Sequence, residues 1–334
     1  MRAASRRQNP DLWRGIGGTY GTLGILTALD IECRPAKKYV NLTYLPVKSF
    51  REAVDTLMAE CAKNHDYVDG IMFAKNRGVV MVGRLSDRRA GRIKRFSRAI
   101  DPWFYLHADR HSRAERTESI PLTDYLFRYD RGGFWVGRQA FRLFDVPFNA
   151  VTRCLLDPLM HTRKMYEALQ VGRVSQQYLV QDLGLPLKNA VNFIKFVDKE
   201  LGVYPLWLCP LNPAGDVSEF QLGGMDDSPM CINVGVWGDQ AADYAEFLRQ
   251  NRLIEKELMR LGGRKWFYAH AYYTEKEFWQ IYNKKWYDDL RRKYHAEHLP
   301  SVFDKVVVKK KYPVDARKGA WSAILGKGKL KVQH

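Results

Sequence analysis

The same order of secondary-structure signals occurs twice along this chain and limits its possible folds more than any other feature. The first copy contains the junction LPVKSFREAV from Leu45, and the second contains LPLKNAVNFI from Leu185. In each copy a strand-like segment precedes a stretch with apolar residues at helical spacing, and two strand-like segments follow. We therefore predict an α+β fold in which two β-α-β-β units share an antiparallel sheet with flanking helices, in a ferredoxin-like pairing.

The helix of each copy is the best-defined element. In the first copy, Ser49 and Glu52 have the spacing of a capping box. The apolar positions on one face are Phe50, Val54, Leu57, Met58 and Cys61 in the first helix, and Ala190, Val191, Ile194 and Val197 in the second. The predicted elements cover residues 37–47, 49–61, 67–74 and 79–86 in the first copy, and 177–187, 188–201, 203–211 and 230–238 in the second.

Further helices are predicted outside the two copies. Asp157 is the expected cap of one helix, with Pro158 at its first position. Gly262 and Gly263 are expected to end a longer amphipathic helix. The predicted helices cover residues 157–169, 241–261 and 276–298. In contrast, residues 92–148 predict irregular structure rich in arginine and aromatic residues, and the basic sequence from Lys305 predicts a mobile tail.

The charge balance favours phosphate-bearing partners. The chain has 54 Lys and Arg against 37 Asp and Glu, a net charge of +17 at pH 7. Nucleic acid, anionic lipid and phosphorylated cofactors all fit this excess. Five widely spaced cysteines without a C-x-x-C motif argue against a disulfide framework and a cysteine zinc site. No apolar run approaches the roughly 20 residues that span a bilayer.

The glycine-rich run GIGGTYGTLGILTALDIE, residues 15–32, resembles a phosphate-binding loop only superficially. A dinucleotide fingerprint requires three glycines between a strand and a helix, but Tyr20 occupies the third place and no strand precedes the run. The Gly-Lys-Ser/Thr of a Walker loop is absent. Ile25, Thr27, Leu29 and Ile31 alternate as in a strand. The run therefore predicts a tight turn into a strand, or a backbone that a flat or phosphorylated ligand can approach closely.

Histidine and carboxylate patterns give weak signals for chemistry. His107 with His111, and His295 with His298, have helical contact spacing. Neither pair has an acidic or cysteine partner in a familiar metal arrangement, so surface or packing roles are favoured and no metal site is predicted. His270 lies among aromatic residues, which favours a buried, hydrogen-bonded side chain.

The remaining catalytic patterns are also weak. The G-x-S-x-G motif is absent. The adjacent carboxylates Asp226 and Asp227, and Asp288 and Asp289, point apart on a helix or strand, which disfavours a paired acid–base role. Basic aromatic stretches are compatible with nucleic-acid binding. The same aromatics are what a core requires, so no nucleic acid is expected as a partner.

Several longer stretches resemble a known family. GTYGTLGILTALDIECRPAKKYVNLTYLPVKSF resembles the end of the FAD-binding domain and the start of the cap in FAD-linked oxidoreductases of the vanillyl-alcohol-oxidase (PCMH-type) superfamily. VYPLWLCPLNP, INVGVWG and AHAYYTEKEFWQIYNKKWYDDLRRKYHAEHLPSVFDKV resemble its delta(24)-sterol reductase subgroup. The resemblance extends from about Leu12 to about Lys305. It implies that NADPH reduces FAD, and that the flavin passes a hydride to a sterol side-chain alkene.

The resemblance also implies roles for particular residues. The Gly-Thr-Leu-Gly turn would lie against FAD, and His270, Tyr272 and Tyr273 would face the flavin and substrate, where one of them supplies a proton. The positions expected to bind the cofactor are Gly18, Gly21, Thr22, Gly24 and Ile25. The expected division is residues 1–36 as the end of the FAD-binding domain, 37–265 as the cap, 266–304 as a helical segment returning to the flavin domain, and 305–334 as a basic tail.

The family's pyrophosphate-binding portion and membrane anchor precede the matching stretch, so we expect a truncated form whose FAD affinity and activity are open. By resemblance the protein belongs at the endoplasmic reticulum membrane, whereas the lack of a spanning segment favours the cytosol. Two other functions stay open. One is a non-catalytic sterol- or membrane-associated binding module, and the other is a basic nucleic-acid-binding protein.

Overall fold

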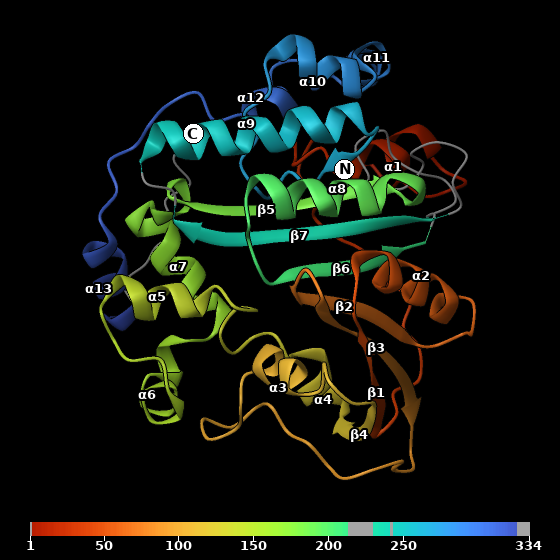
Figure 1. Cartoon of the computed structure of the whole chain (residues 1–334). Coiled ribbons are helices and arrows are strands. Elements are labelled where there is room, and N and C mark those ends of the chain that lie inside the picture. The colour runs from red at the N-terminus through yellow and green to blue at the C-terminus, as the bar shows by residue number, and fades with distance from the viewer. Residues whose placement is uncertain (1, 213–229, 241–242, 326–334) are drawn as a thin grey trace.

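Within the described residues, eight strands form one antiparallel sheet with helices on both faces (Figure 1). The computed structural model describes residues 2–212, 230–240 and 243–325. The strands are β1 (Tyr39–Val47), β2 (Tyr67–Ala74), β3 (Arg77–Ser86), β4 (Arg116–Pro121), β5 (Tyr178–Pro186), β6 (Leu206–Leu211), β7 (Cys231–Gln240) and β8 (Arg264–Lys265). The α-helices are α1 (Pro10–Ile16), α2 (Phe50–Cys61), α3 (Phe104–Arg110), α4 (Leu122–Leu126), α5 (Gly137–Leu143), α6 (Ala150–Leu155), α7 (Thr162–Gly172), α8 (Leu187–Glu200), α9 (Tyr244–Arg260), α10 (Glu275–Ile281), α11 (Lys284–Lys293), α12 (Val302–Val306) and α13 (Ala316–Leu325). Short 3₁₀ turns cover Asp157–Leu159 and Val174–Gln176.

The sheet is built from two units of the same connectivity. Its strand order is β4-β1-β3-β2-β6-β7-β5-β8. In the unit β1-α2-β2-β3 the last strand lies between the other two, and in the unit β5-α8-β6-β7 it does so again. The units meet where β2 pairs antiparallel with β6, with Gly70 opposite Leu208. The predicted repeat, and the antiparallel sheet with flanking helices, are confirmed.

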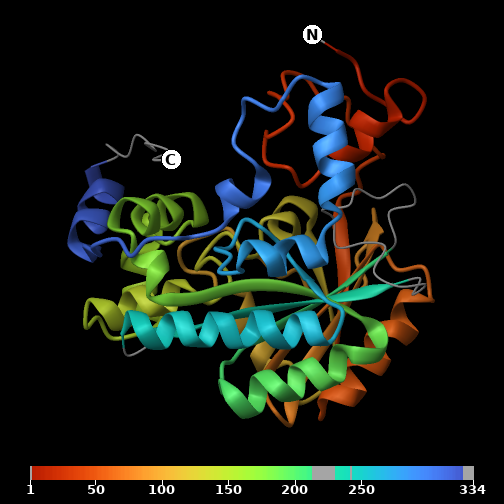
Figure 2. The same cartoon turned by 90° about the horizontal axis from the view of Figure 1, so that it is seen from above.

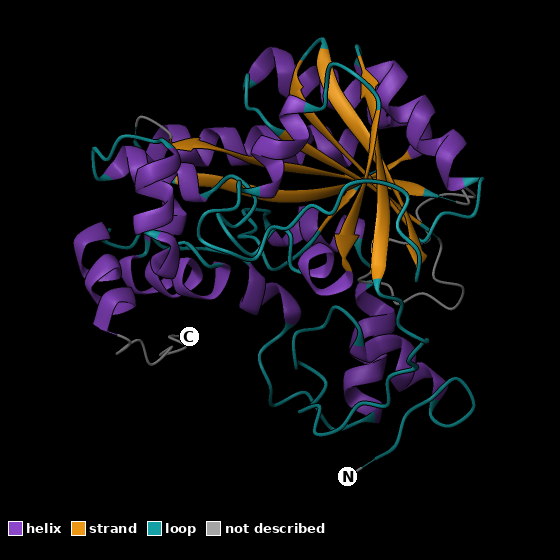
Figure 3. Ribbon diagram, turned by 90° about the horizontal axis from the view of Figure 1, so that it is seen from below, coloured by secondary structure: helices purple, strands orange, loops and turns teal. Residues whose placement is uncertain are grey.

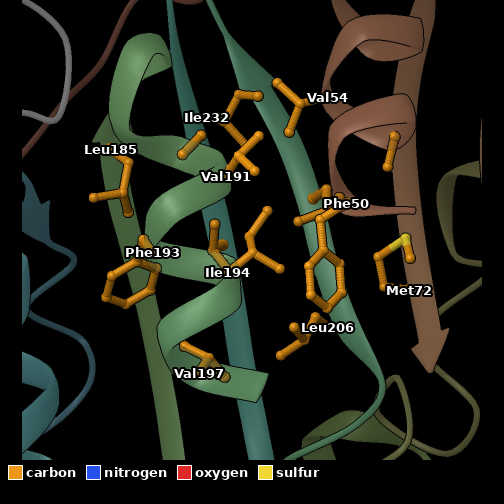
Figure 4. Packing of buried hydrophobic residues seen from close by; sticks show 14 of the residues in the cluster. Phe50, Val54, Met72, Leu185, Val191, Phe193, Ile194, Val197, Leu206 and Ile232 are labelled. Carbon is orange, nitrogen blue, oxygen red and sulfur yellow. The ribbon is translucent and has the colours of Figure 1, made fainter. Parts of the chain in front are cut away.

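One face of the sheet is covered by α2, α8 and α9. Alternate apolar residues of the central strands pack against Phe50 and Val54 of α2 and against Val191 and Ile194 of α8 (Figure 4). Phe193 is completely buried in the same cluster. Apolar residues three or four positions apart on the helices therefore pack against apolar residues two positions apart on the strands. These two spacings place both sets of side chains in one core.

The opposite face carries a second core that is rich in aromatic rings. It contains Phe104 and Tyr105 of α3 and the preceding Trp103. These rings pack with strand residues such as Leu42 and Met81. The segment predicted to be irregular, residues 92–148, contains α3, β4, α4 and α5, so that prediction is wrong in part. Strand β4 is stabilised by pairing along β1, a contact that local composition does not reveal.

A third cluster joins the two ends of the sequence. Helix α1 lies beside α11 (Figures 2 and 3). Leu23 packs with residues of α10 to α12. Asp11 accepts hydrogen bonds from Lys293 Nζ at 2.6 Å and from the Tyr294 hydroxyl at 2.8 Å. The segment before the sheet is therefore held by the segment that follows it.

The strand predicted after the glycine run does not form. Residues 24–37 have no regular secondary structure. Ile25 is 91% exposed, and Leu26, Leu29 and Ile31 are exposed as well. An alternating pattern needs a neighbouring strand for its backbone hydrogen bonds, and no described strand lies beside this segment.

Two predicted helix boundaries are corrected. Helix α7 begins at Thr162 after His161, not at the predicted cap Asp157. The carboxylate of Asp157 instead accepts a hydrogen bond from Arg131 Nε at 2.6 Å, since the buried arginine requires a charged partner. The helix predicted over 276–298 is two helices, α10 and α11, because the side-chain amide of Asn283 caps a new helix.

The other caps agree more closely with the sequence. The Glu52 N–H donates to Ser49 Oγ at 3.1 Å, but the Glu52 carboxylate accepts from the Lys48 N–H, so the predicted capping box is confirmed only on one side. Helix α9 is capped by Asp243, and its end is followed by Gly262 with φ of 69°. The predicted helix start, Ala241, lies outside the described residues.

The predicted mobile tail is ordered over most of its length. The Val308 N–H donates to the Ala271 carbonyl at 2.9 Å, and α13 packs against α7. Gly172 and Gly319 allow the two helices to approach closely. A Cβ atom on Gly319 would stand 2.3 Å from the Ala168 carbonyl oxygen. Residues 326–334 lie outside the described part of the sequence.

We expect Gly319→Ala to loosen α13 from α7, because the added methyl overlaps a backbone carbonyl that cannot rotate away. Overpacking of this kind costs about 1–3 kcal/mol, which corresponds to roughly ten- to hundredfold faster amide hydrogen exchange in α13. Lys318→Ala, at an exposed neighbouring position, is the control and should leave exchange as in the wild type. Equal exchange in both variants contradicts the close helix contact.

Candidate active site

A buried carboxyl group lies on the sheet face opposite α8 and α9. Asp182, in the middle of β5, is 5% exposed. Asn233 Nδ2 donates a hydrogen bond to Asp182 Oδ1 at 2.8 Å, and the Tyr268 hydroxyl donates to Oδ2. Gly235 pairs with Asp182 across β7, and a Cβ atom there would stand 2.9 Å from Oδ1. Glycine at this place on β7 therefore leaves room for the carboxyl group.

Asp182 and Tyr268 both hold their protons tightly. Burial raises the pKa of the Asp182 carboxyl, and the hydrogen bonds from Tyr268 and Asn233 offset only part of that rise. The pKa of the Tyr268 hydroxyl is raised by burial of its hydroxyl end and then by the nearby Asp182. Tyr268 as a whole is 52% exposed. A buried acid reached through a partly exposed tyrosine is suited to proton transfer.

Aromatic rings line the sheet beside Asp182. The Cβ of Trp207 lies next to Gly235, and the Phe134 ring meets the Trp237 ring edge to face at 4.4 Å. Trp135 Nε1 donates to the Trp237 carbonyl at 2.7 Å. The wall is therefore apolar and fixed in place by a hydrogen bond, as in sites that bind apolar ligands.

A second buried carboxylate supports this wall. Asp69 on β2 accepts hydrogen bonds from Arg128 Nη2 and the Tyr129 hydroxyl, both at 3.1 Å, and from Trp207 Nε1 at 3.2 Å. The cationic partner makes Asp69 part of an ion pair that orients Trp207. None of the hydrogen-bond partners described for Asp182 is a cation, so the effect of burial on its pKa is not offset by an opposite charge.

The glycine turn, residues 17–24, has the open backbone that the sequence suggested. Gly18, Gly21 and Gly24 have φ values of 78°, 76° and 141°, and a Cβ on Gly24 would meet no atom within 4 Å. Thr22 is fully buried, and its hydroxyl donates to the Thr19 carbonyl and accepts from Tyr287 at 2.7 Å. The glycines are thus accessible, whereas Thr22 anchors the turn.

The glycine turn lies beside the segment that carries Tyr268. The Tyr20 ring contacts the Phe267 ring, with centroids 6.3 Å apart, and Tyr20 contributes to the raised pKa of Tyr268. Lys305 Nζ donates to the Tyr20 carbonyl at 2.9 Å, which brings a cation to the turn. An open glycine backbone with an adjacent cation fits a flat, phosphorylated cofactor such as FAD.

His270 is partly buried and neutral near pH 7. Burial, and then the positive charge of Lys265, lower the pKa of His270 to about 4. Its carbonyl accepts hydrogen bonds from Gln181 Nε2 at 3.2 Å and from Lys265 Nζ at 2.7 Å. The fixed backbone places the imidazole firmly, but very little of it is protonated near pH 7.

Tyr272 and Tyr273 belong to different clusters. The Tyr272 ring packs edge to face on Phe247 at 5.8 Å and lies 6.4 Å from His270. Tyr273 lies in the third cluster, under the Lys265 ammonium. Burial raises the pKa of both hydroxyls. The structure thus brings His270 and Tyr272 together and directs Tyr273 elsewhere.

A buried ion pair holds this segment. Lys265 Nζ lies 2.9 Å from Glu255 Oε1 of α9, and the same oxygen accepts from the Tyr272 N–H at 2.8 Å. Arg252 donates to the Tyr272 carbonyl and to Glu277 Oε1. Breaking a buried pair costs about 3–5 kcal/mol, so this network fixes the position of the predicted catalytic segment.

The sequence analysis missed Asp182, Asn233 and Tyr268. A carboxylate within the largely apolar strand YLVQDLGLP was the available signal, because a buried acid requires partners. Those partners are 51 and 86 residues away, so spacing alone did not identify them. Of the weak acid pairs, Asp226 and Asp227 lie outside the described residues. Asp288 and Asp289 bind Lys284 and Lys285 on the same helix.

Comparison with known proteins gives the relationship. The delta(24)-sterol reductases of Mus musculus, Homo sapiens and Arabidopsis thaliana are 26%, 27% and 28% identical to this protein. These matches cover 90%, 90% and 89% of this chain, and 59%, 59% and 58% of the relatives. The chain is a relative of the delta(24)-sterol reductases. It spans about three fifths of the length of the curated relatives it matches. No family model matches the sequence.

None of the helices in the described part of the protein is both long enough and apolar enough to cross a membrane. The longest described helix on the sheet, α9, has 17 residues and carries charged side chains along its outer face.

We expect His270 to make stability fall in acid. Folding lowers its pKa from 6.5 to about 4, so its contribution is complete above pH 6.5 and disappears as the pH falls through 4. Between pH 7 and pH 4 the wild type should lose roughly 3 kcal/mol more than His270→Gln, measured by urea unfolding. His298→Gln, at an exposed position, should behave like the wild type. Parallel curves for wild type and His270→Gln exclude a neutral, buried His270.

Proposed function

We propose that this protein takes part in the FAD-dependent reduction of an alkene in a sterol side chain, with NADPH as the electron donor. The observation that carries the proposal is the relationship to delta(24)-sterol reductases over nine tenths of the sequence. The geometry supports it, because an open glycine turn lies beside a buried acid with a partly exposed tyrosine. The two β-α-β-β units would form the ferredoxin-like cap, residues 37–265.

The proposed cofactor contacts lie on the glycine turn. Gly18, Gly21 and Gly24 would present backbone to FAD, and Lys305 would balance its negative charge. Bound FAD would supply the hydride. Ile25, which is exposed directly after the turn, would contact the same flavin-binding region. We assign residues 1–36 to the end of the PCMH-type domain and 266–304 to the segment packed on it. The contact of Leu23 with α10 to α12 supports this division.

The residues of this protein would supply the proton. Reduction of an alkene adds one hydride and one proton across the double bond. We assign the proton to the Tyr268 hydroxyl, which donates a hydrogen bond to the buried Asp182 from a side chain that is partly exposed. After giving its proton to carbon, Tyr268 would regain one from solvent, while Asp182 would orient its hydroxyl through their hydrogen bond. The aromatic wall around Trp237 would hold the apolar substrate beside it.

The residues predicted from the sequence have less suitable surroundings. His270 is neutral near pH 7 because of burial and Lys265. Tyr272 and Tyr273 keep their protons, but they are only 7% and 2% exposed. We therefore assign His270 and Tyr272 to the support of the Tyr268 segment, and we keep Tyr273 as the alternative donor.

The proton donor can be tested with matched Tyr→Phe variants. The protein is reconstituted with FAD, and NADPH oxidation is followed after a delta-24 sterol is added. Tyr268→Phe should lower turnover by about 10²–10⁴-fold, the usual contribution of a general acid. Tyr272→Phe and Tyr273→Phe, which remove the same atom nearby, should retain activity within about tenfold.

Three results would contradict parts of this proposal. A protein that gains no flavin on reconstitution excludes the flavin enzyme for this sequence. Flavin binding without sterol-dependent NADPH oxidation excludes the reaction. A Tyr268→Phe variant as active as Tyr272→Phe removes Tyr268 from the proton path, and a selective loss in Tyr273→Phe would assign that role to Tyr273.

A second candidate function is sterol binding without catalysis. An apolar cavity of about 380 Å³ lies between α5, α7 and α13, a size within the range of small-molecule sites. Its lining includes Phe141, Met165, Leu169, Trp321 and Ile324. The excess positive charge would favour an association with an anionic membrane surface, in agreement with the proposed location at the endoplasmic reticulum.

Filling the cavity separates the two functions. Ala168→Trp places an indole among the lining residues and should weaken the binding of a fluorescent sterol at least about tenfold, because it occupies the apolar volume. Thr123→Trp, on α4 away from the cavity, is the control and should bind normally. Flavin-independent sterol binding that disappears only in Ala168→Trp favours the binding module, and binding that persists in both variants excludes this cavity.

A further inference from the structure

Two histidines and a glutamate meet at the edge of the sheet opposite β8. His107 and His111 lie one helical turn apart on and directly after α3. His107 Nε2 lies 2.6 Å from Glu118 Oε2, and His111 Nε2 lies 4.0 Å from Glu118 Oε1. One ligand atom from each residue lies within 4.8 Å of the other two. The sequence analysis found no acidic partner for this pair in a familiar metal arrangement, and the structure places Glu118 beside both imidazoles.

The fold creates this cluster by strand pairing. Strand β4 pairs with β1 so that Glu118 stands opposite Leu42, which places its side chain on the face that α3 covers. Glu118 and His107 are only 3% and 6% exposed. The Tyr44 ring packs against both imidazoles, with centroids 5.9 Å from His107 and 5.0 Å from His111. Burial and ring contacts therefore fix the positions of the three side chains.

We propose that His107, His111 and Glu118 form a binding site for Zn²⁺ or a similar divalent transition metal. Two imidazole nitrogens and one carboxylate oxygen are the donor set of open zinc sites. Ligand atoms of a tetrahedral zinc ion lie about 3.3 Å apart at Zn–N and Zn–O distances near 2.0–2.2 Å. The two imidazoles lie 2.6 and 4.0 Å from the two different oxygens of Glu118, distances on either side of that value.

A simple ion pair does not account for the whole cluster. A His–Glu pair requires one imidazole, and the structure holds such a pair elsewhere, between His65 Nε2 and Glu60 Oε2 at 2.8 Å. Here a second imidazole faces the same buried carboxylate.

The surroundings specify the fourth ligand as an anion. The three residues line a cavity of about 480 Å³ whose other walls carry mainly basic side chains. The basic lining residues are Arg92, Lys94, Arg95, Arg98, Arg110 and Arg116. Arg116 Nε lies 3.4 Å from Glu118 Oε1, whereas Arg95 and Arg98 pair with Asp124 and Asp101. One glutamate leaves a Zn²⁺ site with a net positive charge, which favours an anion of the phosphate or carboxylate class at the open position.

This site is separate from the proposed reductase site. Strand β4 lies at one edge of the sheet, and β8, next to the Tyr268 segment, lies at the other edge. Six strands stand between them. The metal proposal therefore does not depend on flavin binding or sterol reduction, and either can fail without the other.

The test uses the full-length protein without a histidine tag. Co²⁺ titration should give one bound ion with the intense visible bands of tetrahedral coordination, and Zn²⁺ should displace it. Inorganic phosphate should shift these bands by taking the open position. His111→Gln and Glu118→Gln each remove one ligand with little change of shape, and we expect Zn²⁺ affinity to fall by more than about 100-fold, beyond the usual effect of changing a residue that only supports a ligand. His65→Gln, from the other His–Glu pair, should bind as the wild type.

Several outcomes would overturn the proposal. Co²⁺ spectra of the octahedral aqua type, or Zn²⁺ affinity unchanged in both ligand variants, exclude the site. If the visible absorption bands of bound Co²⁺ do not change when phosphate is added, an anion at the fourth coordination position is excluded. Circular dichroism checks each variant. If Glu118→Gln does not fold, His111→Gln decides alone, since His111 lies at the helix end and is partly exposed.

Discussion

The antiparallel pairing of β2 with β6 is the contact on which the rest of the structure depends. Each β-α-β-β unit alone has three strands and one covering helix, which leaves much of its apolar sheet face open. Pairing the units brings α2 beside α8, so that Phe50, Met72, Leu206 and Ile194 share one core. This pairing joins the two units into one sheet. It therefore buries apolar area on the helix-covered face and makes the opposite face one continuous sheet surface.

The opposite face carries buried acids instead of a purely apolar core. Asp69 on β2, Asp182 on β5 and Glu118 on β4 are each less than 6% exposed, and each has a different kind of partner. Asp69 pairs with an arginine, Asp182 with a tyrosine and an amide, and Glu118 with two histidines. Burial is costly for all three, and in each case hydrogen-bonding partners compensate part of that cost.

The two repeated units were predicted well because local sequence signals define the start, the end or the buried face of their elements. Ser49 caps α2, the stripe from Ala190 to Val197 marks α8, and Gly262 ends α9. Prediction failed where a partner distant in sequence decides the outcome. Residues 25–32 alternate like a strand but have no described neighbour to pair with, whereas β4 has a weak local pattern and forms because β1 lies beside it.

The sequence by itself determined the order of strands and helices within the two similar units, the positive charge and the similarity to delta(24)-sterol reductases. These properties depend on residue spacing, composition and aligned residues, all of which can be determined from the linear sequence. Tertiary structure alone decided which polar groups meet. Asp182 accepts a hydrogen bond from Tyr268, which is 86 residues away in the sequence. The Thr22 hydroxyl accepts one from Tyr287, which is 265 residues away. The physical reason is that hydrogen bonding and charge act over a few ångströms, and only the packed sheet brings such distant residues within that range.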